Sequence, residues 1–498
     1  MNETVNVKQK KGAPASKDAV RNFLALENRE PVVTFAQTRA GKLLVYAIAF
    51  IAMQSFLGAW ASAVVVGAAL VVVALPARRT TVVFFATWAL TLIDTAIGGN
   101  DFGGNIDYVV QQERFVALTP EMLAIIFLLV AMCCAWVSMR FVARHPQSML
   151  ARRPLLTMLA IEASLCIGMV VIPVHGLPRI LLWSSLVVLT PFVWFFPLAI
   201  VDMRSRDASS PLMQLAVQRP FWSPTYLPFG KGAAFLRKHL SQTPRDIAVT
   251  QIKAVKLLLW ANLLMAIRAG LAWSIGEQMQ VPSIHDAIDA YLNGRALPIG
   301  LSWGALVLST FRYSLQIAMW ADIFIGGARL AGYRLPRGSW RPLESRTLME
   351  YFNRFHFYFK ELLVDFFFVP TFFAVFRKRP RLRMFFATFM AAGVGNAIWH
   401  FLRDIHLIAT IGIAEAISTY TSYMFYCVLL AIGVGLSQVR ANLGIRPPSG
   451  VGGRIYSFLF VWSFVVSLRI FSDESRNHSL GERFAFFLSL FGLNLGML

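Results

Sequence analysis

The chain has 498 residues, of which 57% are hydrophobic and only 15% charged, and its formal net charge is +21. Soluble globular proteins carry about a quarter of their residues as charged side chains, so the composition excludes an ordinary soluble protein and indicates a polytopic membrane protein. The basic residues lie mostly between apolar runs, where positive-inside topology and contact with anionic membrane lipids explain them. We therefore expect no nucleic acid among the partners.

The N-terminal region divides into an arm and a long apolar block. Residues 1–42 are polar and charged, and they predict a cytosolic arm that is disordered at its start. The block from Leu43 to Leu75 is 33 residues long. As one helix it would extend about 50 Å, against a hydrocarbon core of about 30 Å. Two short helices that turn near Leu57 and Gly58 fit this block better.

Four further apolar runs precede residue 202, at about 81–97, 120–140, 154–173 and 180–201. The connections between them alternate in charge, since 98–119 is mainly acidic whereas 140–153 holds four arginines. Basic loops mark the cytosolic side of a membrane, so this alternation predicts a cytosolic N-terminus. We assign residues 43–201 to a set of N-terminal transmembrane helices.

The remaining part, residues 202–498, begins with a basic stretch that predicts a loop and an interfacial amphipathic helix. Apolar runs then follow at about 254–275, 298–328, 384–402, 405–437, 455–471 and 484–498, with a dense aromatic segment at about 350–376. The prediction is an all-α polytopic integral membrane protein with about 11 or 12 transmembrane or re-entrant helices. The four cysteines show no metal-ligand spacing, and we expect neither a metal nor a bound cofactor.

The stretch GVGNAIWHFLRD places polar side chains inside an apolar run. In a helix, Asn396, His400 and Asp404 fall at i, i+4 and i+8, on one face. A satisfied buried histidine explains His400 about as well as a functional one, although ionisable residues inside membrane segments are enriched for function. Asp404 has two interpretations, because it could orient the imidazole or pair with Arg403.

A second polar cluster lies in EYFNRFHFYFKELLVDFFFVP, which holds Asn353, His356, Lys360, Glu361 and Asp365. An aromatic belt at the membrane interface, with charged side chains reaching toward water, accounts for the lysine and its neighbours. It accounts less well for His356 in its aromatic setting.

Residues 301–498 resemble the bacterial membrane-bound O-acyltransferases (MBOAT), especially the branch that acetylates exopolysaccharides such as alginate. Four segments carry the resemblance in the order of the family: QIAMWADIFIGGARLAGYRLP, EYFNRFHFYFKELLVDFFFVP, GVGNAIWHFLRD and FVVSLRIFSDESRNHSLGERFAFFLSLFGL. The second places His356 and the third places Trp399 and His400 on the family's histidine positions. We therefore expect residues 202–498 to form an MBOAT-like catalytic membrane core.

The resemblance implies transfer of an acyl group, with acetyl expected, from a cytosolic thioester such as acyl-CoA to a hydroxyl of a polysaccharide, lipid or small molecule. It implies His400 as the catalytic base, because an imidazole near its ordinary pKa can take the acceptor's proton. His356 would assist in orientation or donor binding. The supporting residues implied are Asn396, Trp399, Asn353, Asp322 and Asp365. The expected location is the bacterial cytoplasmic (inner) membrane, with a possible periplasmic acyltransferase partner.

Two other interpretations stay open at this point. A transporter or flippase could use Asp322, His356 and His400 to bind its substrate, although transport does not require a Trp-His pair after the histidine of the aromatic segment. A catalytically inactive MBOAT-like subunit is the other alternative. Phe401 favours it, because this residue stands where the family has a glycine after Trp-His.

Overall fold

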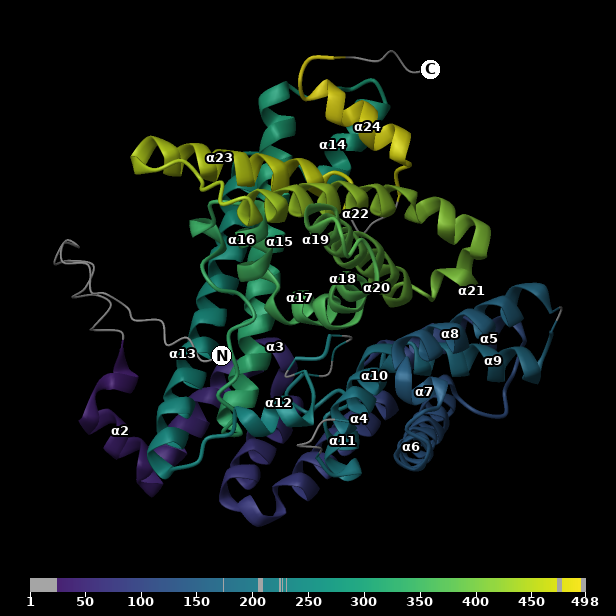
Figure 1. Ribbon diagram of the computed structural model, residues 1–498, viewed down its shortest axis with the longest axis vertical. Helices are drawn as coiled ribbons and strands as arrows, with labels where there is room; N and C mark the ends of the chain where they lie inside the picture. The colour runs from purple at the N-terminus through teal and green to yellow at the C-terminus, as the bar shows by residue number, and fades with distance from the viewer. Residues whose placement is uncertain are drawn as a thin grey trace.

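The structure is a computed structural model that describes residues 25–172, 174–204, 209–223, 225, 227–229, 231–472 and 477–493. Regular structure in these residues is helical, and the pairing of extended backbone is limited there to one antiparallel bridge between Leu240 and Tyr333. Figure 1 shows a layer of helices from the N-terminal half beside a larger bundle from the C-terminal half. The described part of the chain is thus all-α, as the composition predicts.

Eight helical stretches in the described residues are long and apolar enough to cross a membrane. The stretches are Arg39–Ala74, Pro76–Gln112, Pro120–Arg144, Pro154–Val171, Pro244–Gln278, Pro380–Arg403, Ile413–Asn442 and Gly450–Arg469. The pair Leu177–Leu189 and Phe192–Met203 is bent by 57° and passes the same test when taken together. These features define a multi-pass membrane protein, with eight or nine qualifying spans where the sequence predicted 11 or 12 segments.

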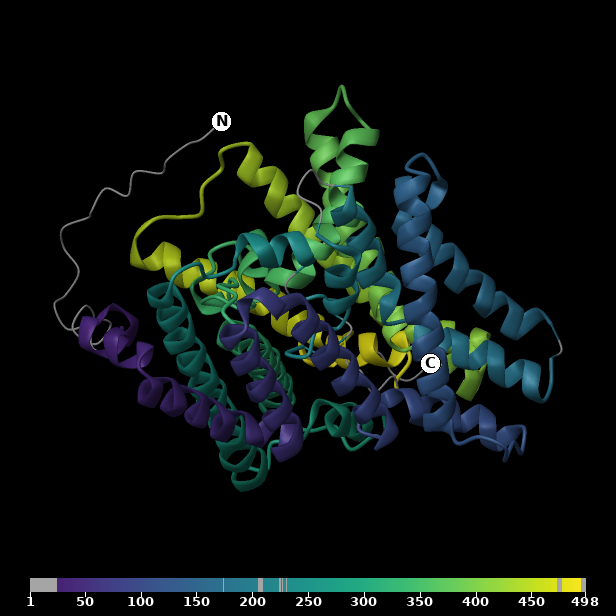
Figure 2. The ribbon, with the colours of Figure 1, turned by 90° about the horizontal axis from the view of Figure 1, so that it is seen from below.

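The first apolar block turns at the glycine that the sequence singles out. Helix α3 (Arg39–Ala74) is interrupted at Gly58, whose φ of 74° and ψ of 173° are not helical. A positive φ costs glycine little because it has no Cβ, so Gly58 can bend the block where another residue would be strained. Helix α3 packs against α13 (Pro244–Leu271), and Figure 2 shows the bent N-terminal helices from below.

The N-terminal layer contains the helices α4 (Arg79–Ala96), α5 (Asp101–Gln112), α6 (Pro120–Arg144), α7 (Met149–Arg152), α8 (Pro154–Val171), α9 (Leu177–Leu189) and α10 (Phe192–Met203). Its hydrophobic core is continuous with the C-terminal half, because Leu362, Phe367 and Leu402 are buried in the same cluster as Trp183 and Trp194. The short helices α11 (Pro211–Ala216) and α12 (Ala233–Lys238) connect this layer to α13. The two halves therefore share one apolar core rather than forming separate bodies.

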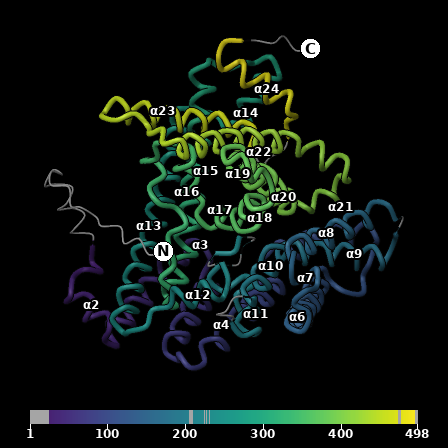
Figure 3. Tube along the Cα trace, viewed as in Figure 1, coloured from purple at the N-terminus to yellow at the C-terminus, as the bar shows by residue number. Residues whose placement is uncertain are grey.

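Helices α13 and α15 (Ile299–Leu330) pack side by side and form the most extensive helix pair in the described residues. The Leu240–Tyr333 bridge joins the start of α13 to the end of α15, so the two helices run antiparallel. Around them lie the remaining helices: α2 (Glu30–Gln37), α14 (Ile284–Leu292), α16 (Leu348–Phe355), α17 (Phe357–Leu363), α18 (Val369–Ala374), α19 (Pro380–Phe389), α20 (Asn396–Arg403), α21 (Leu407–Ile411), α22 (Ile413–Asn442), α23 (Gly450–Arg469) and α24 (Leu480–Ser489). Figure 3 shows α19, α20 and α22 meeting above the N-terminal layer.

Two segments of the C-terminal half are built from short helices. The aromatic segment 350–376, in which the sequence left the number of helices open, is a chain of short pieces: α16, α17, a π-helical turn over Val364–Phe368 and α18. The last run, expected at 484–498, overlaps the 10-residue helix α24, which begins at Leu480 and ends at Ser489, and residues 494–498 lie outside the described part of the chain. By helix rise α24 is about 15 Å long, which is too short to cross the hydrocarbon core.

Candidate active site

His400 lies on a short helix that a π-helical turn introduces. The turn covers Met390–Gly395 and passes directly into α20, which carries Asn396 at its start and His400 one turn later. Both side chains are buried, with 2% of Asn396 and 7% of His400 exposed. The shared face that the i, i+4 spacing predicts is therefore present. π-helical insertions occur frequently at functional sites, because they change which side chains face inward.

Close packing of two π-helical turns fixes the start of α20. A Cβ added at Gly395 would lie 2.6 Å from Cδ2 of Phe367, which belongs to the turn Val364–Phe368. The absence of a side chain at Gly395 is what allows this approach. Phe367 itself is buried in the apolar core of the N-terminal layer. The position of α20 thus depends on contacts that tie it to both halves of the molecule.

The ring of His400 is held by a tyrosine from another helix. The hydroxyl of Tyr423, on α22, lies 2.8 Å from Nε2 of His400. The phenol can donate to a bare nitrogen or accept from a protonated one, depending on the tautomer. Trp399 packs edge-on against the imidazole, with ring centroids 4.8 Å apart. The sequence analysis missed Tyr423, since a tyrosine in an apolar run gives no sign of its partner.

His356 lies at the junction between two helices. It ends α16 and precedes α17, with a non-helical φ of −125° and ψ of 56°. Phe357 N donates to Gly338 O at 3.0 Å and Tyr358 Oη donates to Pro336 O at 2.9 Å, so the segment after the junction is fastened to residues 336–338. Phe355 packs edge-on against the His356 ring at a centroid distance of 4.2 Å. The break in the helix is what turns this histidine inward.

One large cavity, of about 970 Å³, brings most of the expected site residues together. Five of the seven line it, namely His400, His356, Asn396, Trp399 and Asn353. Its wall also includes Tyr423 from α22 and Asp94, Phe102 and Arg219 from the N-terminal layer and the loop that follows it. The site is therefore built by both halves of the chain, whereas the sequence placed it in residues 202–498 alone.

The other two expected residues lie outside the cavity lining. Asp322 is 4% exposed on α15, directly after Ala321, which does line the cavity. Asp365 pairs instead with Lys231, at 2.8 Å between Oδ2 and Nζ, and Lys231 also pairs with Glu361. The lysine thus fastens the start of the π-helical turn to the loop before α12.

The two alternatives for Asp404 are distinguished by its contacts. Arg403 Nε lies 2.9 Å from Oδ1 of Asp404 and Nη2 lies 3.0 Å from Oδ2, so the pair is bidentate. Asp404 ends α20 and lies outside the cavity lining, whereas Arg403 lines it. Asp404 therefore pairs with Arg403. Phe401 also lies outside the lining, and its ring packs edge-on against Tyr420 at 5.5 Å.

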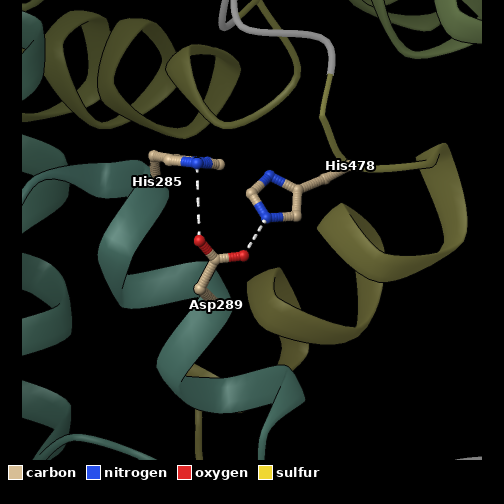
Figure 4. A group of neighbouring side chains, drawn as sticks. All are labelled: His285, Asp289 and His478. Atoms are coloured by element: carbon tan, nitrogen blue, oxygen red, sulfur yellow. Dashed lines mark hydrogen bonds and ion pairs between the residues drawn. The ribbon is translucent and has the colours of Figure 1, made fainter.

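A separate cluster of side chains could hold a divalent cation. Each of His285, Asp289 and His478 offers one ligand atom, and these atoms lie within 4.8 Å of one another. Figure 4 shows both imidazoles directed at the Asp289 carboxylate. His478 Nε2 lies 2.8 Å from Oδ1, and His285 Nε2 lies 3.4 Å from Oδ2. The hydrogen bond from His478 and the charge of His285 hold the pKa of Asp289 below its ordinary value. The hydrogen bond between His478 and Asp289 and the ion pair between His285 and Asp289 account for this arrangement, although imidazole and carboxylate are also zinc ligands.

The fold and the cavity define an all-α, multi-pass membrane protein with a large internal chamber lined by two histidines. No family model matches the sequence, and no curated protein matches it.

Proposed function

We propose that the protein is a membrane-bound O-acyltransferase of the MBOAT type, which moves an acyl group, with acetyl expected, from a thioester to an acceptor hydroxyl. The single observation that carries the proposal is that His400 and His356, on separate helices, line the same cavity together with Asn396 and Trp399. Residues of three of the four segments that resemble the family thus line one cavity, which supports the proposal. The cavity lies at the upper end of the roughly 300–1,000 Å³ typical of ligand sites, which leaves room for an acyl thioester and an acceptor.

In the proposed reaction, the imidazole of His400 takes the proton of the acceptor hydroxyl while its oxygen attacks the thioester carbonyl. The tetrahedral intermediate then breaks its carbon–sulfur bond, and the thiol leaves with the proton from the imidazolium. Tyr423 is assigned the role of holding the ring, because its hydroxyl bonds Nε2 in a buried setting. Asn396 faces the same cavity and can donate from its amide to the developing oxyanion.

Phe401 bears on the alternative of a catalytically inactive subunit. A bulky residue after Trp-His could have closed the acceptor side of the site. In the structure its ring packs against Tyr420, and Phe401 is not among the residues that line the cavity. The substitution is therefore compatible with acyl transfer, and the proposal retains an active enzyme in the inner membrane.

The test is acyl transfer in membranes from cells that produce the wild-type protein or His400→Ala. Membranes receive radiolabelled acetyl-CoA, and the alkali-labile label in the non-lipid and lipid fractions is counted separately. The matched control is His175→Ala, whose side chain is 81% exposed and lies outside the cavity. We expect background incorporation for His400→Ala at unchanged membrane abundance, and wild-type incorporation for the control. Full incorporation by His400→Ala would overturn the assignment of the base.

A further inference from the structure

A second, smaller cavity lies beside the first and is lined by three arginines from three helices. It has a volume of about 250 Å³ and is lined by Arg268 of α13, Arg312 of α15 and Arg469 of α23. The remaining polar lining consists of neutral or weakly basic side chains, Ser283, His285, Ser309, Tyr313 and Gln316. Among the lining residues, all of which the structure describes, there is no carboxylate.

The arginines have far more donors than acceptors around them. A guanidinium carries five N–H donors and is always charged, so the three together offer about fifteen. Arg268 donates to Gln316 Oε1 at 3.3 Å, and Arg469 donates to Ser309 Oγ at 3.3 Å and to Ser472 O at 3.2 Å. Arg268 Nε and Arg312 Nε are buried and have no hydrogen-bond partner among the described residues. The pocket therefore has fewer acceptors than donors, and its lining carries no carboxylate.

The nearby cluster of Figure 4 does not supply that charge. His285 lines the pocket and contacts the carboxylate of Asp289. That carboxylate also contacts His478, and Asp289 is absent from the lining of the pocket. The free-energy cost of the three arginine charges also depends on whether their helices lie within the membrane. Arg268 lies within Pro244–Gln278, one of the stretches that are long and apolar enough to cross a membrane. Charged side chains at such positions in membrane proteins are rare and mark functional sites.

The pocket borders the cavity that contains His400. Tyr313 lines both, and its ring faces the guanidinium of Arg469, whose Cζ lies 4.3 Å from the ring centroid. The pocket is smaller than the roughly 300–1,000 Å³ of sites that hold drug-sized ligands. It has room for a charged group attached to a larger molecule that continues toward Tyr313.

We infer that Arg268, Arg312 and Arg469 form a binding site for an oxyanion, a carboxylate or phosphate group. We further infer, on the basis of the proposed acyltransferase function, that this group belongs to the acceptor whose hydroxyl reaches His400. Guanidinium groups bind both anions through paired, charge-assisted hydrogen bonds. The acceptor class is thus an acidic sugar or a phosphate-bearing molecule, and a neutral glycan lacks the group that the pocket recognises.

The test measures anion binding directly, so that it does not depend on catalysis. Full-length protein in a neutral detergent at fixed ionic strength is heated with sodium glucuronate, inorganic phosphate or glucose, and the unfolding midpoint is recorded. A second arm compares nanodiscs of phosphatidylcholine with nanodiscs that also contain phosphatidylglycerol, which separates a soluble anion from a lipid headgroup. The variants are Arg312→Gln, Arg312→Lys and, as matched control, the exposed Arg446→Gln.

We expect glucuronate, phosphate or phosphatidylglycerol, but not glucose, to raise the midpoint of wild type and Arg446→Gln. Arg312→Gln should bind about tenfold more weakly or worse, because it loses charge-assisted hydrogen bonds, and Arg312→Lys should fall between. Without ligand, Arg312→Gln should unfold at or above the wild-type midpoint, since it relieves repulsion between cations. Equal shifts in wild type and Arg312→Gln, or no shift with any anion, would refute the site.

The outcome for His400→Ala separates this inference from the proposed function. Anion binding should persist in that variant. If His400→Ala proves fully active in acyl transfer while the anion still binds through Arg312, the proposed base fails and the oxyanion site stands. If transfer depends on His400 but no anion binds, the oxyanion site fails and the acyltransferase proposal stands.

Discussion

Removing the hydroxyl group of Tyr423 tests whether its hydrogen bond to His400 serves catalysis. The Tyr423 Oη–His400 Nε2 hydrogen bond is 2.8 Å long and buried. Tyr423→Phe keeps the ring and deletes only this bond, which leaves a ring nitrogen unsatisfied at a cost of about 1–3 kcal/mol. If the imidazole must recover its orientation before it can react, acyl transfer should fall by about 5- to 160-fold, since 1.36 kcal/mol corresponds to a factor of ten.

A neighbouring tyrosine provides a matched control for this variant. Tyr420 is on the same helix and stacks with Tyr423 at 5.6 Å, but its hydroxyl donates to the carbonyl of Ala397 at 2.6 Å. Tyr420→Phe therefore removes a similar hydrogen bond without touching the imidazole. The assay is incorporation of labelled acetyl groups per unit of protein in membranes, with the unfolding midpoint measured for both variants. Equal transfer rates for the two variants would refute the positioning role of Tyr423.

Two further predictions concern packing and pH. Gly395→Ala should destabilise the fold by about 1–3 kcal/mol, because its Cβ would lie 2.6 Å from Phe367. The control Gly452→Ala, whose Cβ would lie in open space, should leave the unfolding midpoint unchanged. Equal midpoints for the two variants would contradict the close approach of Gly395 to Phe367. Glu113 accepts hydrogen bonds from Arg179 and Gly176, which hold its pKa below the ordinary glutamate value. Wild type should therefore be more stable than Glu113→Gln at neutral pH, and the difference in their free energies of unfolding should disappear as the pH falls through the lowered pKa of Glu113. A difference that stays constant from pH 7 to 3 would contradict the lowered pKa.

The membrane architecture is the part that the sequence predicts best, because apolar length and glycine conformation are local properties. The turn at Gly58 was predicted from a block too long for one span, and the structure confirms it. The helices of the segment 350–376 and of the last run were harder to predict, because apolar composition does not distinguish a long helix from short pieces joined by π-helical turns. Packing decides that difference, as at Gly395 and Phe367, where the contact joins segments almost thirty residues apart.

The candidate site was predictable only where its residues share one helix. The spacing of Asn396 and His400 places them on one face, and the structure confirms that both are buried and line one cavity. The approach of His356 was expected from the family resemblance alone, since no local pattern relates the two histidines. Tyr423 and Arg219 gave no signal, because their roles arise from helices that meet only in the fold.

Two sets of polar groups in the helices differ in their partners, and the difference bears on where ligands bind. In one set the fold itself supplies the partners: Asp404 pairs with Arg403, and the buried Arg483 donates to the carbonyls of His478 and Ile470.

In the other set, described polar atoms that line the two cavities have no partner among the described residues. They include Asn396 Oδ1 and Trp399 Nε1 in the larger cavity, and Arg268 Nε, Arg312 Nε and His285 Nδ1 in the smaller. A buried polar atom without a hydrogen bond is costly, so a bound molecule that supplies the missing partners gains affinity at those points. The larger cavity offers a donor at Trp399 and an acceptor at Asn396, which suit a hydroxyl-bearing group. The smaller is lined by three arginines and no carboxylate, which suits an anion. Together with the shared wall at Tyr313, this division favours one acidic, hydroxylated acceptor lying across both cavities over two unrelated ligands.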